Sequence, residues 1–311
     1  MPYTRLIPVV LLKHGLLVRS QSFRVHQVIG NPISTIHRYS SWDLDELVLL
    51  DISRDSDFHD LRRGDLQIDY KGDTFLHVIS EISKVCCMPF TVGGKIKTID
   101  DIARRLEHGA DKCSINSAAL DNPKFISEAA KRFGSQCIVL AIDAKREEDG
   151  QITLWKRGAT EKADISLTDW AKQAEDLGAG EIFLNSINCD GIGEGYDNDL
   201  IAQAVDAVNI PVIACGGVGE YEHFGETVKN TNVSAVAAAN IFHFREISYP
   251  HAKKVCQETG INIRPYEAEN KWFKREPEYN YKVRDERIAK TMAFHVPLET
   301  KAPKTNIQYC T

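Results

Sequence analysis

Eight short apolar runs follow one another along this chain, and they limit its fold more than any other feature. Each is at most eight residues long and almost continuously apolar, as strands are when both faces of a parallel sheet are buried. The runs occupy residues 5–12, 46–52, 89–94, 112–116, 137–143, 181–187, 211–217 and 234–240. They predict eight buried strands.

The segments between the runs have amphipathic helical patterns. In residues 98–109, Thr98 is expected to cap a helix and Gly109 to end it. Residues 121–134 repeat this pattern, with Asp121 at the start and Gly134 at the end. Eight strand–helix units in succession predict an α/β fold, a closed (β/α)8 TIM barrel. The eightfold count and the missing GxGxxG motif disfavour the rival, an open doubly wound sheet.

Two segments of the chain look alike. PFTVGGKI begins at Pro89 and PVIACGGV begins at Pro211, 122 residues further on. A repeat of this length predicts a barrel built from two half-barrels, with equivalent binding sites on opposite sides of the barrel. We expect residues 1–265 to form the barrel. Residues 266–311 are expected to be a C-terminal extension that lies on the barrel or on a partner, with a loosely ordered tail as the alternative.

Composition excludes several classes of protein. The 311 residues carry a net charge of −6, whereas a nucleic-acid binder needs clustered positive charge. No apolar stretch reaches 18 residues, so no membrane span is expected. Pro8, Lys13 and His14 interrupt the N-terminal apolar run, which we interpret as a strand rather than a signal peptide. Eight cysteines without a CxxC pair predict free thiols in a cytoplasmic protein, and neither a metal nor a cofactor is expected.

Small and polar residues stand where the predicted strands end, which is where such barrels carry their sites. Backbone N–H groups at these positions bind phosphate when a helix follows. A single Gly-Gly would indicate a turn, but its occurrence in both halves favours two phosphate sites. The candidates are Gly93, Gly94, Asn116 and Ser117 in the first half, and Asp190, Gly191, Gly216, Gly217 and Asn240 in the second.

Two carboxylates at strand ends are candidates for acid–base catalysis. Asp143 ends the run CIVLAID, and Asp51 ends the run ELVLLDI. Partial burial at the end of a strand raises the pKa of a carboxyl group toward neutral pH, which suits proton transfer. The alternative for Asp143 is a helix cap or an ion pair with Lys145.

Several motifs resemble the HisF family, the cyclase subunits of imidazole glycerol phosphate synthase. They are DELVLLDI, ADKCSINS, GAGEIFLNSINCDG, IACGGVGEYEHF and AAANIFHFREI, and the resemblance covers residues 4–264. It implies a (β/α)8 barrel that receives ammonia at its bottom from a glutaminase subunit of the HisH type. It also implies a lyase of histidine biosynthesis that acts on a phosphorylated small molecule at the top of the barrel.

The resemblance implies two catalytic aspartates, and only one is present. Asp143 matches the aspartate that ends the fifth strand, whereas Leu11 stands where the family has the aspartate of the first strand. Leucine transfers no proton. Arg19 matches a lysine of the family's first loop. At the phosphate sites, Lys95 replaces a glycine and Asn240 replaces a serine.

The other end of the barrel matches the family throughout. Arg5, Glu46, Lys112 and Glu181 fall on the family's ring of charges that gates the entry of ammonia, and Asp111 falls on a residue that faces the glutaminase. A purely structural ion-pair network is the alternative for these charges.

Three interpretations follow. In the first, the chain forms a heterodimer with a HisH-type glutaminase and passes ammonia to a different acceptor or a third enzyme, as in acetamidino-sugar synthesis for surface lipopolysaccharide. In the second, it is a cyclase subunit of imidazole glycerol phosphate synthase. In the third, it is a non-catalytic scaffold that activates the glutaminase. Leu11 places the cyclase activity in doubt, so whether the chain is itself an enzyme stays open here.

Overall fold

The computed structural model describes residues 2–53, 74–86, 88–244 and 247–266, together with the backbone of two short strands, β13 (Phe273–Arg275) and β14 (Lys282–Arg284). The chain divides into two compact units, residues 1–266 and 267–311. In the second unit, β13 and β14 pair antiparallel. Most of the predicted C-terminal extension, residues 266–311, lies outside the described residues.

Eight parallel strands close into a barrel, as predicted. Every apolar run coincides with one strand: β1 (Arg5–Lys13), β4 (Leu47–Asp51), β5 (Phe90–Gly93), β6 (Lys112–Ile115), β7 (Ile138–Arg146), β10 (Glu181–Ser186), β11 (Val212–Cys215) and β12 (Ala235–Ala238). The pairings of β12 with β1 and of β7 with β10 close the ring. The repeated segments supply β5 and β11, which are the third and seventh strands of the ring.

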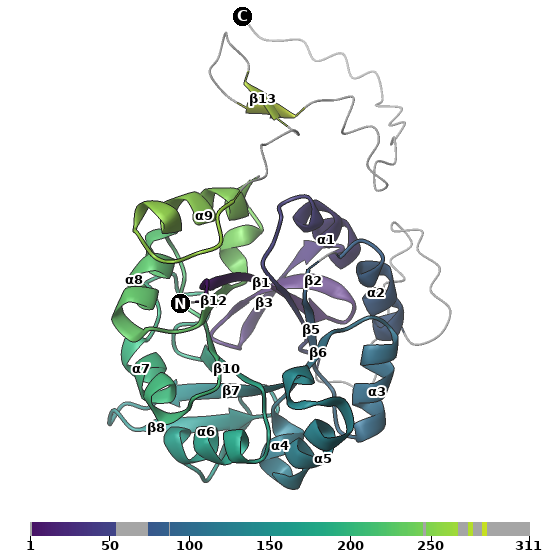
Figure 1. Ribbon diagram of the computed structural model, residues 1–311, viewed down its shortest axis with the longest axis vertical. Coiled ribbons are helices and arrows are strands. Elements are labelled where there is room, and N and C mark those ends of the chain that lie inside the picture. The colour runs from purple at the N-terminus through teal and green to yellow at the C-terminus, as the bar shows by residue number, and fades with distance from the viewer. Residues whose placement is uncertain are drawn as a thin grey trace, which may run out of the picture. The chain divides into compact units, whose positions relative to one another are not determined.

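Helices surround the ring of strands (Figure 1). They are α1 (Pro32–Ser40), α2 (Thr74–Ser83), α3 (Ile99–Glu107), α4 (Ser117–Asp121), α5 (Lys124–Phe133), α6 (Leu167–Asp176), α7 (Asn198–Ala207), α8 (Glu222–Thr231) and α9 (Ser248–Glu258). Two 3-10 turns, η1 (Ser135–Cys137) and η2 (Asn240–Phe242), complete the set in the described residues. None of these helices combines the length and apolar character needed to span a bilayer.

The helix boundaries test two predicted caps. Thr98 caps α3 as expected, because its side chain accepts a hydrogen bond from the backbone N–H of Asp101 while the Asp101 carboxylate accepts one from the backbone of Thr98. The prediction for Asp121 is wrong. This residue ends α4, and its carboxylate binds Lys156 at 2.6 Å instead of starting the next helix.

Two antiparallel hairpins extend barrel strands, and the apolar pattern did not predict them. Strands β2 (Leu16–Gln21) and β3 (Val25–Gly30) continue the sheet from the end of β1. Strands β8 (Ile152–Lys156) and β9 (Glu161–Ala163) do the same from the end of β7. Both hairpins therefore stand at the C-terminal ends of the barrel strands, which we call the mouth.

Side chains fill the inside of the barrel. The interior cluster consists of Ile7, Val9, Leu11, Val18, Val48, Val139, Phe183, Ile213, Cys215, Ala235 and Ala237, all of which are buried. A separate and larger apolar layer lies between the strands and the helices. The interior cluster separates the mouth from the opposite end of the barrel, the floor, where the N-terminal ends of the strands meet.

Candidate functional site

Four charged side chains at the N-terminal ends of four strands form a closed ring at the floor, which we call the floor ring. Arg5 binds Glu46 at 2.5 Å and Glu181 at 2.9 Å, and Lys112 binds the same two carboxylates at 3.1 and 2.8 Å. The Thr91 hydroxyl donates a further hydrogen bond to Glu46 at 3.0 Å. Each buried carboxylate therefore meets two cations, which offsets the cost of its desolvation. The structure brings together all four residues that the sequence singled out.

Asp111 directly precedes Lys112 of the floor ring in the sequence, and its side chain is exposed. Its carboxylate accepts a hydrogen bond from the backbone N–H of Phe90 at 2.8 Å, and its own N–H donates to the Phe90 carbonyl at 2.8 Å. These bonds fix Asp111 on the surface beside the N-terminal end of β6. Its role at a partner interface stays a prediction.

Asp143 lies at the mouth with its carboxylate held by an amide. The Asn116 side-chain N–H2 donates to Asp143 Oδ2 at 2.8 Å. Burial raises the pKa of the Asp143 carboxyl to about 7; the Asn116 bond opposes this shift, and the negative charge of Asp190 adds to it. Lys145 forms its ion pair with Glu147 at 2.5 Å. Asp143 therefore has the protonation behaviour that a group acting as both acid and base requires.

Leu11 places an apolar surface on another side of the mouth. It pairs in register with Val18 of β2 and Leu50 of β4, and only 8% of it is exposed. Leu50 and Ile52 pack against the same interior cluster. These four residues, Leu11, Val18, Leu50 and Ile52, form the apolar arc. The arc supplies no proton-transferring group.

Asp51 and Lys95, predicted in different roles, form an ion pair with each other. The distance from Lys95 Nζ to Asp51 Oδ2 is 3.4 Å, and the Asp51 side chain is fully buried. Lys95 has a φ of +53°, a conformation that glycine adopts more readily. A Cβ on the neighbouring Gly94 would lie 2.2 Å from the Asp51 carbonyl oxygen, so the close approach requires glycine there. Gly93, which ends β5, completes this turn.

The β8–β9 hairpin contacts two of the predicted phosphate residues of the first half, Asn116 and Ser117. Ser117 Oγ accepts a hydrogen bond from the backbone N–H of Arg157 at 2.9 Å. Arg157 and Lys156 both bind Asp121, which ends the five-residue helix α4. The Ser117 hydroxyl therefore already accepts a hydrogen bond from the hairpin.

In the second half, predicted phosphate residues hold the β2–β3 hairpin. The Asp190 carboxylate accepts hydrogen bonds from Ser20 Oγ at 2.6 Å and from the backbone N–H of Phe23 at 3.0 Å. The Asn240 amide donates to the Ser20 carbonyl at 2.8 Å. Gly191 lies so close that a Cβ would come within 2.2 Å of the same carbonyl oxygen. These contacts join the hairpin to two loops of the second half.

The paired glycines after β11 permit a close backbone contact. Gly216 and Gly217 have φ values of +97° and +111°. The Gly217 carbonyl accepts a hydrogen bond from the Gly195 N–H at 2.8 Å, and a Cβ on Gly217 would lie 1.9 Å from the Gly195 carbonyl oxygen. The two segments therefore pack backbone against backbone.

Asn185 lies at the mouth, where the sequence predicts small and polar residues at the strand ends. It is the penultimate residue of β10 and pairs in register with Asp143. Its Oδ1 atom is buried and accepts no hydrogen bond from the described residues. The alternation of β10 places Asn185 on the same face as Glu181 and Phe183.

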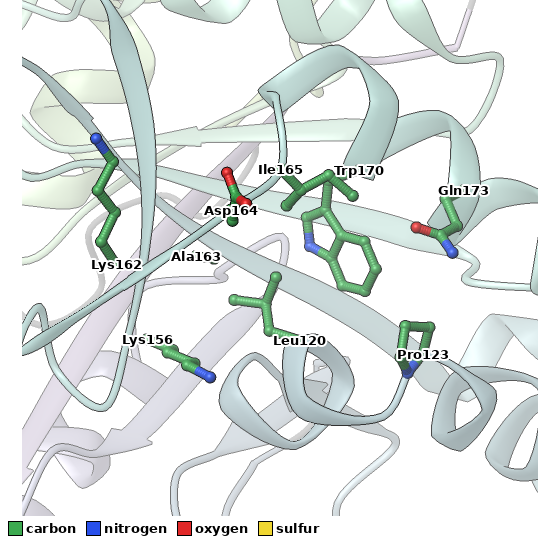
Figure 2. A pocket seen from close by; sticks show the side chains of 9 residues that line it. All are labelled: Leu120, Pro123, Lys156, Lys162, Ala163, Asp164, Ile165, Trp170 and Gln173. Atoms are coloured by element: carbon green, nitrogen blue, oxygen red, sulfur yellow. The ribbon is translucent and has the colours of Figure 1, made fainter.

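A small pocket of about 230 Å³ lies elsewhere, among side chains of α4, β8, β9 and α6 and the segments that join them (Figure 2). It contains none of the predicted site residues, and Trp170 forms part of its wall. The described residues contain no cluster of three or more His, Cys, Asp or Glu side chains that could hold a metal ion. The pocket is therefore separate from the predicted site residues.

Comparisons with known proteins agree with this geometry. A family model described as histidine biosynthesis protein matches residues 5–248. The imidazole glycerol phosphate synthase subunit HisF of Natranaerobius thermophilus is 43% identical over 260 residues, which is 84% of this chain and 98% of that protein. The subunits of the same name from a Hydrogenobaculum species and from Caulobacter vibrioides are 43% and 40% identical, over 84% of this chain and 98% and 96% of their own lengths.

Proposed function

The chain belongs to the HisF family, and from that premise we propose that it is the barrel subunit of a glutamine-dependent synthase that takes in ammonia at its floor and uses it at its mouth. One observation carries the proposal. A closed ring of four charges and a carboxyl group with a pKa of about 7 occupy opposite ends of one barrel interior. The first controls entry and the second transfers protons.

The partner in this proposal is a glutaminase subunit of the HisH type, forming a heterodimer with this chain. The relatives are named as subunits, and the exposed Asp111 lies beside the floor ring, where such a partner would bind. Ammonia would enter when the ion pairs of Lys112 rearrange. The ring holds two cations and two carboxylates, which pair with one another.

The first candidate reaction is that of imidazole glycerol phosphate synthase in histidine biosynthesis. The names of the relatives favour this interpretation over the other two. Asp143 would then carry out both proton transfers. A pKa of about 7 supplies both protonation states at neutral pH, which such a double role demands.

The second candidate is delivery of ammonia to a different acceptor, such as a third enzyme of surface-polysaccharide synthesis. Leu11 favours it, because the apolar arc supplies no second acid or base. The ion pair of Lys95 with Asp51 favours it too, since Asp51 is thereby engaged. No observation at the floor favours the third interpretation, a scaffold without ammonia transfer.

The deciding experiment measures glutamine hydrolysis by the HisH-type glutaminase alone and with this chain, with and without the family's ribulosyl bisphosphate. We expect the chain to bind and stimulate the glutaminase. Formation of imidazole glycerol phosphate identifies the cyclase. Stimulation without that product identifies delivery to another acceptor, and a failure to bind or stimulate contradicts the proposal.

A further inference from the structure

The pocket of about 230 Å³ that Figure 2 shows lies outside the ring of barrel strands and is lined by α4, the β8–β9 hairpin, α6 and the segments that join them. We call it the side pocket. The indole ring of Trp170 forms part of its wall, and its other apolar side chains are those of Leu120, Pro123, Ala163 and Ile165. A ligand bound there would be held apart from the predicted site residues of the mouth and the floor.

One hydrogen-bond donor in the wall of the side pocket lacks a partner. Trp170 is only 1% exposed, and its Nε1 atom finds no acceptor among the described residues. In Figure 2 the nitrogen edge of the indole faces Leu120 and Ala163, which line the same pocket. An indole N–H can only donate, and a buried donor without an acceptor is destabilising. This N–H therefore calls for a ligand that brings an acceptor.

A second donor comes from the end of β8. Lys156 Nζ forms ion pairs with Asp121 at 2.6 Å and with Glu161 at 2.8 Å, and only 15% of its side chain is exposed. An ammonium group carries three N–H bonds, so two carboxylates leave one N–H for a further acceptor. In Figure 2 the Lys156 side chain extends toward Leu120, across the pocket. The side pocket thus offers one neutral and one charged donor.

The exposed side chains of the side pocket do not oppose an anion. Lys162 and Asp164 are both exposed and carry opposite charges, so their effects on an anion offset each other. Buried donors beside an apolar wall suit a carboxylate that is attached to an apolar body. We propose that the side pocket binds a small organic acid. Its carboxylate accepts hydrogen bonds from Trp170 Nε1 and Lys156 Nζ, and its apolar body packs on the wall.

The test uses the full-length chain and benzoate as the probe. Tryptophan is labelled with ¹⁵N, which gives one indole N–H signal for each of the four tryptophans of the chain, and the signal that disappears in Trp170→Phe belongs to Trp170. We expect sodium benzoate, at pH 7 and constant ionic strength, to shift the Trp170 signal saturably. The signal of Trp42, which stacks on Tyr39 outside the pocket, should stay in place. No saturable shift of the Trp170 signal overturns the inference.

Benzamide tests the role of the carboxylate, because it has a similar shape and no charge. A hydrogen bond to a charged acceptor is stronger than one to a neutral acceptor, so benzamide should bind about tenfold more weakly than benzoate. Equal affinities for the two probes would overturn the assignment of an acid.

The indole donor is tested by calorimetric titration with benzoate. Trp170→Phe keeps an aromatic ring in the wall and removes the N–H, and should weaken benzoate binding about tenfold, the effect of one hydrogen bond. Trp42→Phe is the matched control, because Trp42 is also buried, at 4% exposure, and does not line the pocket. Equal weakening by both variants contradicts the assignment.

The charged donor is tested in the same way. Lys156→Met keeps the apolar part of the side chain and should weaken benzoate binding about tenfold or more. Glu161→Gln also breaks an ion pair of Lys156 but leaves its ammonium group in place, so benzoate binding should not weaken. Equal weakening by Glu161→Gln would show that Lys156 only holds the hairpin, and would overturn its part in the site.

Discussion

The floor and the mouth of this barrel satisfy their polar groups in different ways. At the floor, two cations and two carboxylates bind one another in a closed ring. At the mouth, some polar groups hold the hairpins and others, such as Asn116 Oδ1 and Asn185 Oδ1, have no described donor. The four charges of the floor therefore satisfy one another, whereas the mouth keeps buried acceptors without a donor from the described residues.

The two ends also differ in the partners of their buried carboxylates. Glu46 lies between two cations, Arg5 and Lys112. Asp143 lies beside a neutral amide in a buried place, and its pKa is raised to about 7. The floor carboxylate is therefore paired with cations, whereas the mouth carboxylate has a neutral hydrogen-bond donor.

The largest effect is expected from Asp143→Asn at the mouth. The substitution removes the acid–base group and should lower product formation by the assembled synthase about 10²- to 10⁴-fold. The initial rate with glutamine as nitrogen donor measures it. Binding of the glutaminase should be unchanged, since the floor is untouched. A rate near that of the wild type would contradict the role of Asp143.

At the floor we expect a loss of stability instead. Lys112→Met leaves Glu46 and Glu181 with one cation between them, and should lower the free energy of unfolding by about 3 kcal/mol. Urea denaturation measures this change. Lys84→Met is the matched control, because Lys84 pairs with Glu81 on the surface with 65% of its side chain exposed, and should cost well below 1 kcal/mol. Equal costs would show that the floor ring is no more than a surface network.

Leu11→Asp introduces, within the apolar arc, the aspartate that the HisF family has on the first strand. We expect it to lower the free energy of unfolding by about 1–3 kcal/mol, because it buries a polar group among Val18 and Leu50. If a missing second acid limits cyclase activity, the variant should form more imidazole glycerol phosphate than the wild type. Leu11→Asn, which is polar but not acidic, is the control. A fully active wild type would refute the argument from Leu11.

The pH dependence of stability tests the raised pKa of the Asp143 carboxyl group. Because the pKa of Asp143 is higher in the folded chain than the ordinary value of about 3.9, the folded state binds the extra proton between pH 4 and 7. Its contribution to stability is therefore fully present below pH 4 and is lost as the pH rises through about 7. The difference in Tm between wild type and Asp143→Asn should change over this interval and level off above it. A difference independent of pH would contradict the raised pKa.

The barrel was predictable because its strands carry a strong local signal. A continuously apolar run such as residues 5–12 indicates a strand wherever it lies in the chain, and eight runs indicate a closed ring. The hairpins were missed because their short strands have mixed patterns. β3, for example, carries Val25 with 62% of its surface exposed.

The site residues were predictable only where a local sequence pattern or the family resemblance marks them. Residue type and strand end located Asp143, and the resemblance located the floor charges. Neither the residue type nor the resemblance shows which polar groups form hydrogen bonds or ion pairs within the folded chain. Asp190 and Asn240 hold a hairpin that begins about 170 and 220 residues earlier, and Lys95 binds Asp51. Contacts between such distant segments leave no mark in a local pattern.

The floor ring also bears on the order in which the chain assembles. Its members come from the first, second, fourth and sixth barrel strands, so Arg5 and Glu46 are synthesised long before Glu181. A chain that has emerged only as far as Lys112 would bring together two cations and one carboxylate, an unbalanced cluster. Folding dominated by such distant contacts is slow. Arrival of β10 neutralises the cluster, so Glu181 would favour barrel closure only once three-quarters of the strands exist.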